Sequence, residues 1–286
     1  MNHFFTVSAH PSLRVELCDI GASIRQIYYE DTPMLYTTDP EAFVKPNKEF
    51  FSQFVGPVAG RIKDAEIKGF QFVANENANA LHSSTFRFCW KRFNRDILEE
   101  EKQIRVIFTY EDELFGGRYL AVIEYCLSRL EPKLTTRMSM TSTVYMPVNL
   151  TTHLYFNLGE KNVESIFLKI PSSKRAEYDN EGIPLRFVDV DGQFDLREGK
   201  LLTAMYDHAF LLDKGPIEAH GEKVNLVVNT DGESVIVYTD IPSQQRVGHS
   251  LGFTLESVQH ALLGPDMILP EGITETTTIE YTFSRR

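Results

Sequence analysis

The stretch from Ile104 to Tyr110 reads IRVIFTY, and the stretch from Leu120 to Leu127 reads LAVIEYCL. Both are rich in β-branched and aromatic residues, a composition typical of strands. Comparable runs recur along the chain, at Leu13 to Leu17, Leu134 to Val144, Ile166 to Ile170, Val224 to Val228, Val235 to Thr239 and Thr276 to Phe283. The sequence therefore predicts a protein built mainly from strands, several of them longer than usual.

Helix signals are weak. Asp39 followed by Pro40 predicts one short helical turn, with Asp39 as its N-cap and proline at the first helical position. No long amphipathic helix is visible. Because parallel strands need long crossover connections, usually helices, we expect the strands to form large antiparallel sheets that stack face to face.

The connections between the strand runs carry two further expectations. The chain contains no internal repeat and no flexible linker, so we expect one continuous all-β domain over residues 1–286. The tetrapeptide Thr230-Asp231-Gly232-Glu233 lies between two strand runs and supplies the Asp-Gly pair of a tight turn. It predicts a hairpin in which these two runs pair antiparallel.

Composition excludes several classes of protein. Hydrophobic residues make up 42% of the chain and aromatic residues 12%, which is typical of a folded globular protein. The formal net charge of −11 argues against a nucleic-acid binder or a protein of anionic membranes, because both use basic surface to neutralise phosphate. The N-terminus lacks the pattern of a secretory signal, and no apolar run reaches the length of a membrane span. A cytoplasmic protein that binds a small molecule is expected.

Several cofactor and nucleophile motifs are absent from the sequence. Cys18, Cys89 and Cys126 are scattered and form no CxxC pair, which predicts buried or half-buried free thiols. The sequence has no HExxH, no HxH, no GxSxG elbow, no P-loop and no dinucleotide fingerprint after a strand. We therefore expect no metal and no other cofactor.

Five segments carry ionisable groups that ordinary packing does not require. They contain Arg61 in GPVAGRI (56–62), His82 in NALHSS (79–84), His153 in TTHLYFNL (151–158), Asp207 in YDHAFL (206–211) and Glu256 in GFTLESV (252–258). Each has a simpler explanation: a solvated loop arginine, hydrogen-bonded structural histidines, a strand cap, and a glutamate on the solvent face of a strand. Two carboxyl groups, Asp207 and Glu256, also leave glycoside hydrolysis open, and the histidines and acids could converge on a metal in principle.

Taken in order, these segments resemble the motifs of the aldose 1-epimerase, or galactose mutarotase, family. The matching residues are Gly60-Arg61, Leu81-His82-Ser83-Ser84, Thr152-His153-Leu154-Tyr155-Phe156-Asn157-Leu158, Asp207-His208 and Leu255-Glu256. The resemblance spans nearly the whole chain. It implies a large antiparallel β-sandwich with an open sugar-binding cleft on one sheet.

The resemblance also implies roles for these residues. Glu256 is expected to be the general base that takes the proton of the C1 hydroxyl, and His153 the general acid that protonates the ring oxygen. Arg61, His82 and Asp207 are expected to bind the sugar. Tyr155 or Phe156 is expected to pack beneath the ring. The implied partner is a free monosaccharide such as galactose or glucose, and we expect a monomer or a weak homodimer.

Three departures from the family pattern point to a divergent branch. Gly60 and Thr152 each stand where the family has asparagine, and Ser83-Ser84 replaces two glycines. Galactose is therefore not implied as the preferred sugar. Two alternatives stay open. One is an epimerase of hexose 6-phosphates, for which Arg87, Lys91 and Arg92 are the candidate phosphate ligands. The other is a carbohydrate-binding or sensing module that lacks catalysis.

Overall fold

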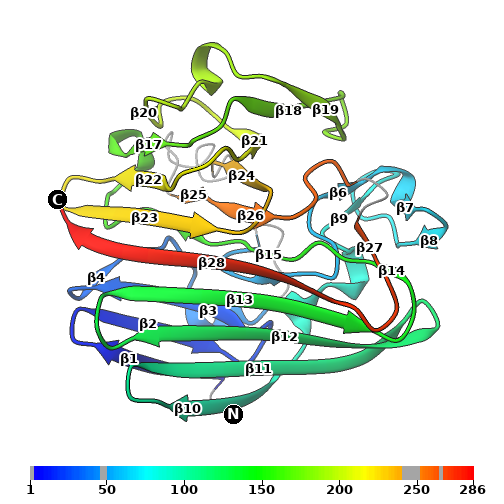
Figure 1. The fold of residues 1–286 in the computed structure, drawn as a ribbon, viewed down its shortest axis with the longest axis horizontal. Coiled ribbons are helices and arrows are strands. Elements are labelled where there is room, and N and C mark those ends of the chain that lie inside the picture. Colours follow the sequence, from blue (N-terminus) through cyan, green and yellow to red (C-terminus); the bar gives the residue numbers. More distant parts are fainter. Residues whose placement is uncertain (1–2, 46–49, 240–251, 264–266) are drawn as a thin grey trace.

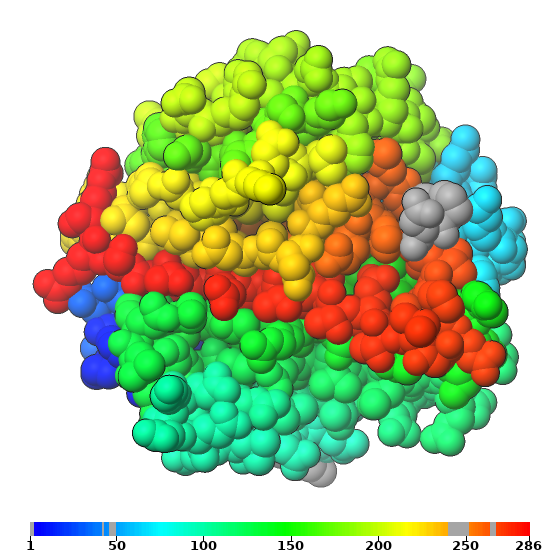
Figure 2. All heavy atoms as spheres, viewed as in Figure 1, coloured from blue at the N-terminus to red at the C-terminus, as the bar shows by residue number. Residues whose placement is uncertain are grey.

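The computed structural model describes residues 3–45, 50–239, 252–263 and 267–286. Its largest unit is a nine-stranded antiparallel sheet (Figure 1). In sheet order the strands are β10 (Asn94–Glu99), β11 (Gln103–Leu114), β12 (Gly117–Ser128), β13 (Lys133–Ser142), β28 (Thr274–Arg285), β23 (Val224–Thr230), β22 (Ile217–His220), β17 (Phe167–Lys169) and β20 (Lys200–Leu201). In the space-filling view, β28 forms a red band between the green β13 and the yellow β23 (Figure 2).

The two runs IRVIFTY and LAVIEYCL lie side by side in this sheet. They belong to β11 and β12, which pair antiparallel with Val106 opposite Tyr125 and Phe108 opposite Ile123. These four side chains are buried, because successive residues of a strand point to opposite faces and the apolar set faces the core. The expected antiparallel β architecture is confirmed.

Smaller sheets pack against the large one. One has the order β1 (Phe4–His10), β2 (Leu13–Cys18), β3 (Ser23–Tyr29), β4 (Thr32–Pro33), and another the order β19 (Pro184–Asp189), β18 (Lys174–Tyr178), β21 (Asp207–Leu211), β24 (Ser234–Tyr238), β26 (Glu256–Val258). Two-stranded pairs join β5 (Phe54–Val55) to β15 (Thr151–Thr152), β6 (Arg61–Ile62) to β9 (Ala80–Leu81), β7 (Glu66–Ile67) to β8 (Phe70–Gln71), β14 (Met146–Pro147) to β27 (Ile268–Leu269), and β16 (Tyr155–Phe156) to β25 (Phe253–Thr254). One large apolar core draws residues from most of these sheets.

Helical structure in the described residues is short. The predicted turn is helix α1 (Pro40–Phe43), and Asp39 caps it by accepting a hydrogen bond from the Glu41 amide at 3.0 Å. Single 3-10 turns occur at Lys63–Ala65, Ser84–Phe86, Phe88–Trp90, Val163–Ser165 and Gly192–Phe194. No helix in the described part of the chain is long and apolar enough to cross a membrane.

The predicted hairpin at Asp231-Gly232 is wrong. The strands on either side belong to different sheets: β23 pairs with β22 and β28, whereas β24 pairs with β21 and β26. The Asp231 carboxylate accepts a hydrogen bond from the Thr278 amide at 2.7 Å, which extends the pairing along β28. A Cβ atom at Gly232 would lie 2.1 Å from the Ser257 hydroxyl oxygen. The glycine therefore allows a close approach between two sheets and does not serve a tight hairpin turn.

The cysteines behave as predicted. Cys18, Cys89 and Cys126 are buried and free of disulfides. Burial raises the pKa of each thiol to about 12, so all three are held as neutral, unreactive thiols at neutral pH.

Candidate active site

A single cleft of about 440 Å³ is lined by all five side chains that the motifs single out, Arg61, His82, His153, Asp207 and Glu256. They come from separate elements: Arg61 from β6, His82 from the end of β9, His153 from the end of β15, and Asp207 and Glu256 from the first positions of β21 and β26. Long-range strand pairing thus gathers residues that are far apart in the sequence.

His153 is held by its backbone on both sides. Its amide donates to the Gln53 carbonyl and its carbonyl accepts from the Ser52 amide, both at 2.9 Å. These bonds continue the pairing of β15 with β5 past the end of the two strands. The ring packs against the Tyr155 and Phe50 rings, with centroids 5.1 and 5.9 Å away, and the residue is 5% exposed. The imidazole therefore has little freedom to turn.

Glu256 faces His153 directly. Its Oε1 atom lies 3.3 Å from His153 Nε2 and accepts a hydrogen bond from the Thr254 hydroxyl at 3.2 Å. The Thr254 oxygen in turn accepts from the Tyr238 amide at 3.0 Å, which leaves its own proton to donate to Glu256. Glu256 is 2% exposed. Glu256 therefore does not lie on the solvent face of its strand. Although β26 is the last strand in the order of its sheet, its first residue points into the cleft.

Burial acts in opposite directions on the two partners. It raises the pKa of Glu256 to about 8, with a further contribution from the Asp207 charge, and it lowers the pKa of His153 to about 3. At neutral pH the pair therefore shares one proton, held as a neutral carboxyl and a neutral imidazole. Within the described residues, His153 Nδ1 and Glu256 Oε2 have no hydrogen-bond partner on another residue. Buried polar atoms of this kind are costly unless a ligand or water meets them.

His82 is fixed as a hydrogen-bond donor. Its Nδ1 atom accepts a hydrogen bond from the Gly60 amide at 3.1 Å, so the ring proton must be on Nε2. Burial, followed by the positive charges of nearby side chains, lowers the pKa of His82 well below its usual value. The ring lies 5.5 Å from that of His153 and 4.6 Å from that of Phe50, between centroids. Gly60, which stands where the family has asparagine, thus contributes its backbone amide to the site and no side chain.

A metal ion fits this set of residues poorly. One potential ligand atom from each of His82, His153 and Glu256 lies within 4.8 Å of the other two. However, the lone pair of His82 Nδ1 is taken by the Gly60 amide and its Nε2 carries the proton. Ligation through either nitrogen would break this arrangement. The set is better suited to donate a hydrogen bond to an oxygen atom.

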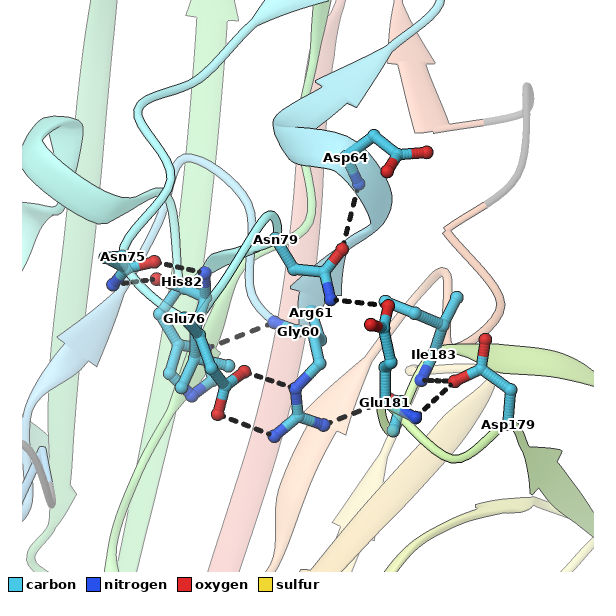
Figure 3. A network of polar contacts seen from close by, with 12 residues as sticks. Gly60, Arg61, Asp64, Asn75, Glu76, Asn79, His82, Asp179, Glu181 and Ile183 are labelled. Atoms are coloured by element: carbon cyan, nitrogen blue, oxygen red, sulfur yellow. Dashed lines mark hydrogen bonds and ion pairs between the residues drawn. The ribbon is translucent and has the colours of Figure 1, made fainter.

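Arg61 is held by two neighbours and keeps free donors. Its Nε and Nη2 atoms donate to the two carboxylate oxygens of Glu76, and its Nη1 atom donates to the Gly182 carbonyl at 3.0 Å (Figure 3). Gly182 has a φ of 74°, a left-handed backbone conformation that favours glycine, and a Cβ atom there would also crowd Nη1. Three of the five guanidinium protons are used by these bonds. Asp207 stands nearby in the cleft wall, and partial burial raises its pKa while the Arg61 charge opposes the rise.

The serines that replace two glycines adopt the backbone that glycine favours. His82, Ser83 and Ser84 have φ values of 51°, 62° and 50°, a left-handed region that is costly for residues with a side chain. Ser83 compensates, because its hydroxyl accepts from the Val58 amide at 2.7 Å and donates to the Val58 carbonyl at 2.9 Å. Thr152 points away from the cleft and contacts the Tyr281 hydroxyl at 3.3 Å.

Two aromatic residues that were considered together separate in the structure. Tyr155 lines the cleft. Phe156 lies in the core, with its ring 5.5 Å from that of Tyr281 and 6.1 Å from that of Phe253. Phe156 is therefore not placed to pack beneath a bound ring, because adjacent strand residues point to opposite faces. For Tyr155 this role stays a prediction.

The basic residues considered as phosphate ligands do not line the cleft. The Arg87 guanidinium stacks over the rings of Phe50 and Trp90, at 4.9 and 4.5 Å from their centroids. Lys91 pairs with Asp112 at 3.3 Å, and Arg92 forms a backbone bridge with Ile20.

Other residues of the site carried no motif signal. Asn149 joins two walls of the cleft, because its side-chain amide donates to the Ala59 and His260 carbonyls and its Oδ1 accepts from the His260 amide. Glu76, which holds Arg61, lies in a polar loop that sequence analysis did not single out. An acidic residue in such a loop is ordinary, and only the pairing of β6 with β9 brings it to the cleft.

Comparison with known proteins indicates the same family that the sequence motifs resemble. A model of the aldose 1-epimerase family matches residues 4–281. The chain is 27% identical over 269 residues to the aldose 1-epimerase of Escherichia coli (strain K12), covering 85% of this chain and 73% of that one. It is 27% identical over 275 residues to the galactose mutarotase of Homo sapiens, covering 87% and 79%.

Solved structures share the fold. The galactose 1-epimerase from Lactobacillus acidophilus NCFM superimposes with a TM-score of 0.90 at 20% identity, covering 99% of this chain and 94% of that one. An aldose epimerase homologue from C. elegans superimposes with a TM-score of 0.86 at 20% identity, covering 99% and 98%.

Proposed function

This chain belongs to the aldose 1-epimerase family, and we propose that it interconverts the α and β anomers of a free aldose. The observation that carries the proposal is the buried pair of His153 and Glu256, 3.3 Å apart in a cleft of about 440 Å³. A proton donor and a proton acceptor at this spacing suit a reaction that moves two protons on neighbouring oxygens of one sugar.

In the proposed reaction, the proton of the pair first moves from Glu256 to His153, which gives a carboxylate and an imidazolium. The carboxylate takes the proton of the C1 hydroxyl while the imidazolium gives its proton to the ring oxygen. The bond between C1 and the ring oxygen breaks, and C1 becomes an aldehyde. After rotation about the bond from C1 to C2, the ring closes from the other face. The same protons return, so the pair is restored without any cofactor.

Three other residues are assigned to binding in this proposal. His82 offers its Nε2 proton, and Arg61 offers the guanidinium protons that Glu76 and Gly182 leave unused. Asp207, which lines the cleft, would accept hydrogen bonds from sugar hydroxyls. Such hydrogen bonds to charged groups are among the stronger ones and orient the ring on the acid–base pair.

The proposal is tested by measuring anomer exchange directly. Purified protein is mixed with freshly dissolved galactose, glucose, xylose or arabinose, and the approach to the anomeric equilibrium is followed by polarimetry. We expect a rate above that of buffer for at least one sugar. If no sugar exchanges faster while ligand-observed NMR detects binding, the chain is a binding module and the proposal is wrong. The cytoplasmic location and the monomer or weak homodimer stay predictions.

A further inference from the structure

The charges around the cleft are unbalanced. Among the described residues that line it, Arg61 is the only lysine or arginine, whereas Glu76, Asp207 and Glu256 are all acids. Glu256 holds a proton at neutral pH because burial raises its pKa to about 8. The groups that carry charge in the resting site are then Arg61 against Glu76 and Asp207.

Glu76 is held rigidly in this arrangement. Its backbone pairs with that of Asn79 through two hydrogen bonds of 3.1 and 3.0 Å. The side chain of neighbouring Asn75 clamps the Leu81 backbone, accepting at 2.7 Å and donating at 3.2 Å. Asn79 also donates a hydrogen bond to Glu181 at 3.3 Å (Figure 3). The loop thus fixes the backbone of Glu76, and the contact with Arg61 holds its carboxylate.

The ion pair with Glu76 neutralises the charge of Arg61. Both carboxylate oxygens meet the guanidinium side on, which is the strong two-point geometry for this pair. An anion that entered the cleft would meet an arginine that is already neutralised, with the carboxylates of Glu76 and Asp207 close by. These carboxylates repel an anion, and solvent moderates the repulsion because the Glu76 side chain is 38% exposed.

We propose that Glu76 is a specificity-determining residue, whose carboxylate neutralises Arg61 so that the cleft accepts uncharged aldoses and rejects sugars that carry a carboxylate or a phosphate. The inference rests on the proposed anomer exchange and adds to it a residue that sets the charge of the substrate. Hydroxyl groups still find the free guanidinium protons of Arg61, because a hydroxyl oxygen needs a donor and not a net charge.

The experiment compares galactose with galacturonate and galactose 6-phosphate in three proteins. In the parent chain, we expect kcat/KM for both anionic sugars to be at least about 100-fold below that for galactose. Glu76→Gln keeps the shape of the side chain and one acceptor for Arg61 but removes the charge. It should raise the ratio of anionic to neutral kcat/KM at least about tenfold. Glu181→Gln is the control: it removes a carboxylate that belongs to the same network but does not line the cleft. This variant should leave the ratio of anionic to neutral kcat/KM unchanged.

The outcomes separate this inference from the proposed function. If the parent chain exchanges galactose and galacturonate equally well, Glu76 has no such role although the epimerase activity stands. The same conclusion follows if Glu76→Gln exchanges galactose but keeps the parent ratio. If no neutral sugar is exchanged, the proposed function itself fails. If Glu76→Gln does not fold, as judged by circular dichroism, the salt dependence of the parent protein provides the test. Added salt should raise kcat/KM for galacturonate but not for galactose. An equal response of the two sugars would overturn the inference.

Discussion

The Nε2 atom of His153 lies 3.3 Å from the Oε1 atom of Glu256, and both side chains are buried in the lining of the cleft. Desolvation favours the uncharged form of each, so the pair keeps one proton where two isolated groups in water would be a carboxylate and a partly charged imidazole. Shifts of pKa in opposite directions within one buried pair are typical of functional sites.

The free energy of unfolding should depend on pH through this pair. Relative to ordinary values of 4.5 and 6.5, the pKa of Glu256 is raised to about 8 and that of His153 is lowered to about 3. Between pH 4.5 and 6.5 the folded and unfolded pair both hold one proton, so its contribution is flat. Above 6.5 the folded pair holds more protons than the unfolded one, so stability falls as pH rises towards 8. Below 4.5 it holds fewer, so stability falls as pH drops towards 3.

Urea unfolding across the pH range checks this dependence. Glu256→Gln cannot ionise and should lose the decline above pH 6.5 that the parent protein shows. Glu222 is exposed, and Glu222→Gln serves as the control that should keep the parent profile. Parallel profiles for the parent protein and Glu256→Gln would contradict the assignment of the shared proton.

Removing either partner of the pair should abolish most of the anomer exchange. A positioned acid or base contributes roughly 10²–10⁴-fold to a rate, so Glu256→Gln and His153→Gln should each lower kcat by that factor. Polarimetry gives the rate, and ligand-observed NMR tests whether sugar still binds. A folded variant that retained more than a tenth of the parent kcat would remove that residue from the acid–base role.

Thr254 should tune the base through one hydroxyl. It accepts from the Tyr238 amide and donates to Glu256. Thr254→Val should therefore destabilise the fold by about 1 kcal/mol, because it removes the hydrogen bond that the Thr254 hydroxyl accepts from the partly buried Tyr238 amide. It should also raise the pKa of Glu256 further, since a hydrogen bond that favours the carboxylate is lost. In Thr254→Val the basic limb of the pH–rate profile should move to higher pH, whereas Thr254→Ser should keep the parent profile. A profile that does not move would show that the hydroxyl has only a structural role.

Sequence patterns and chain topology differ in what they can predict here. The strands IRVIFTY and LAVIEYCL were predicted because their signal is local and repeated over many residues. The prediction of a hairpin at Asp231-Gly232 was wrong. Turn residues are a local signal, whereas β24 pairs with β26 from the far end of the chain. The five motif residues stood out as ionisable groups in unusual positions, and the family resemblance implied their roles. Glu76 carried no such signal and reaches the cleft through the pairing of β6 with β9. The single domain stays a prediction.

The tautomer of His82 offers a spectroscopic prediction. The Gly60 amide occupies Nδ1, so we expect the neutral ring with its proton on Nε2 throughout the neutral pH range. Long-range correlation of the ring nitrogens with the ring carbon protons in ¹⁵N-labelled protein distinguishes the two tautomers and the charged form. A proton on Nδ1, or titration of the ring near pH 6.5, would contradict the assignment.

Ser83 and Ser84 should respond to glycine in opposite directions, although both have left-handed backbones with φ of 62° and 50°. Ser84→Gly relieves a backbone cost and gives up no hydroxyl contact to another described residue, so it should stabilise the fold by about 0.5–1 kcal/mol after the greater freedom of the unfolded glycine is counted. Ser83→Gly relieves the same cost but removes both bonds to Val58, which is buried. Its amide and carbonyl would be left unpaired, so a net destabilisation of about 1 kcal/mol or more is expected. Urea unfolding of the two variants measures both changes. If both variants shifted stability in the same direction, the compensation assigned to the Ser83 hydroxyl would be wrong, because the two positions differ chiefly in that contact.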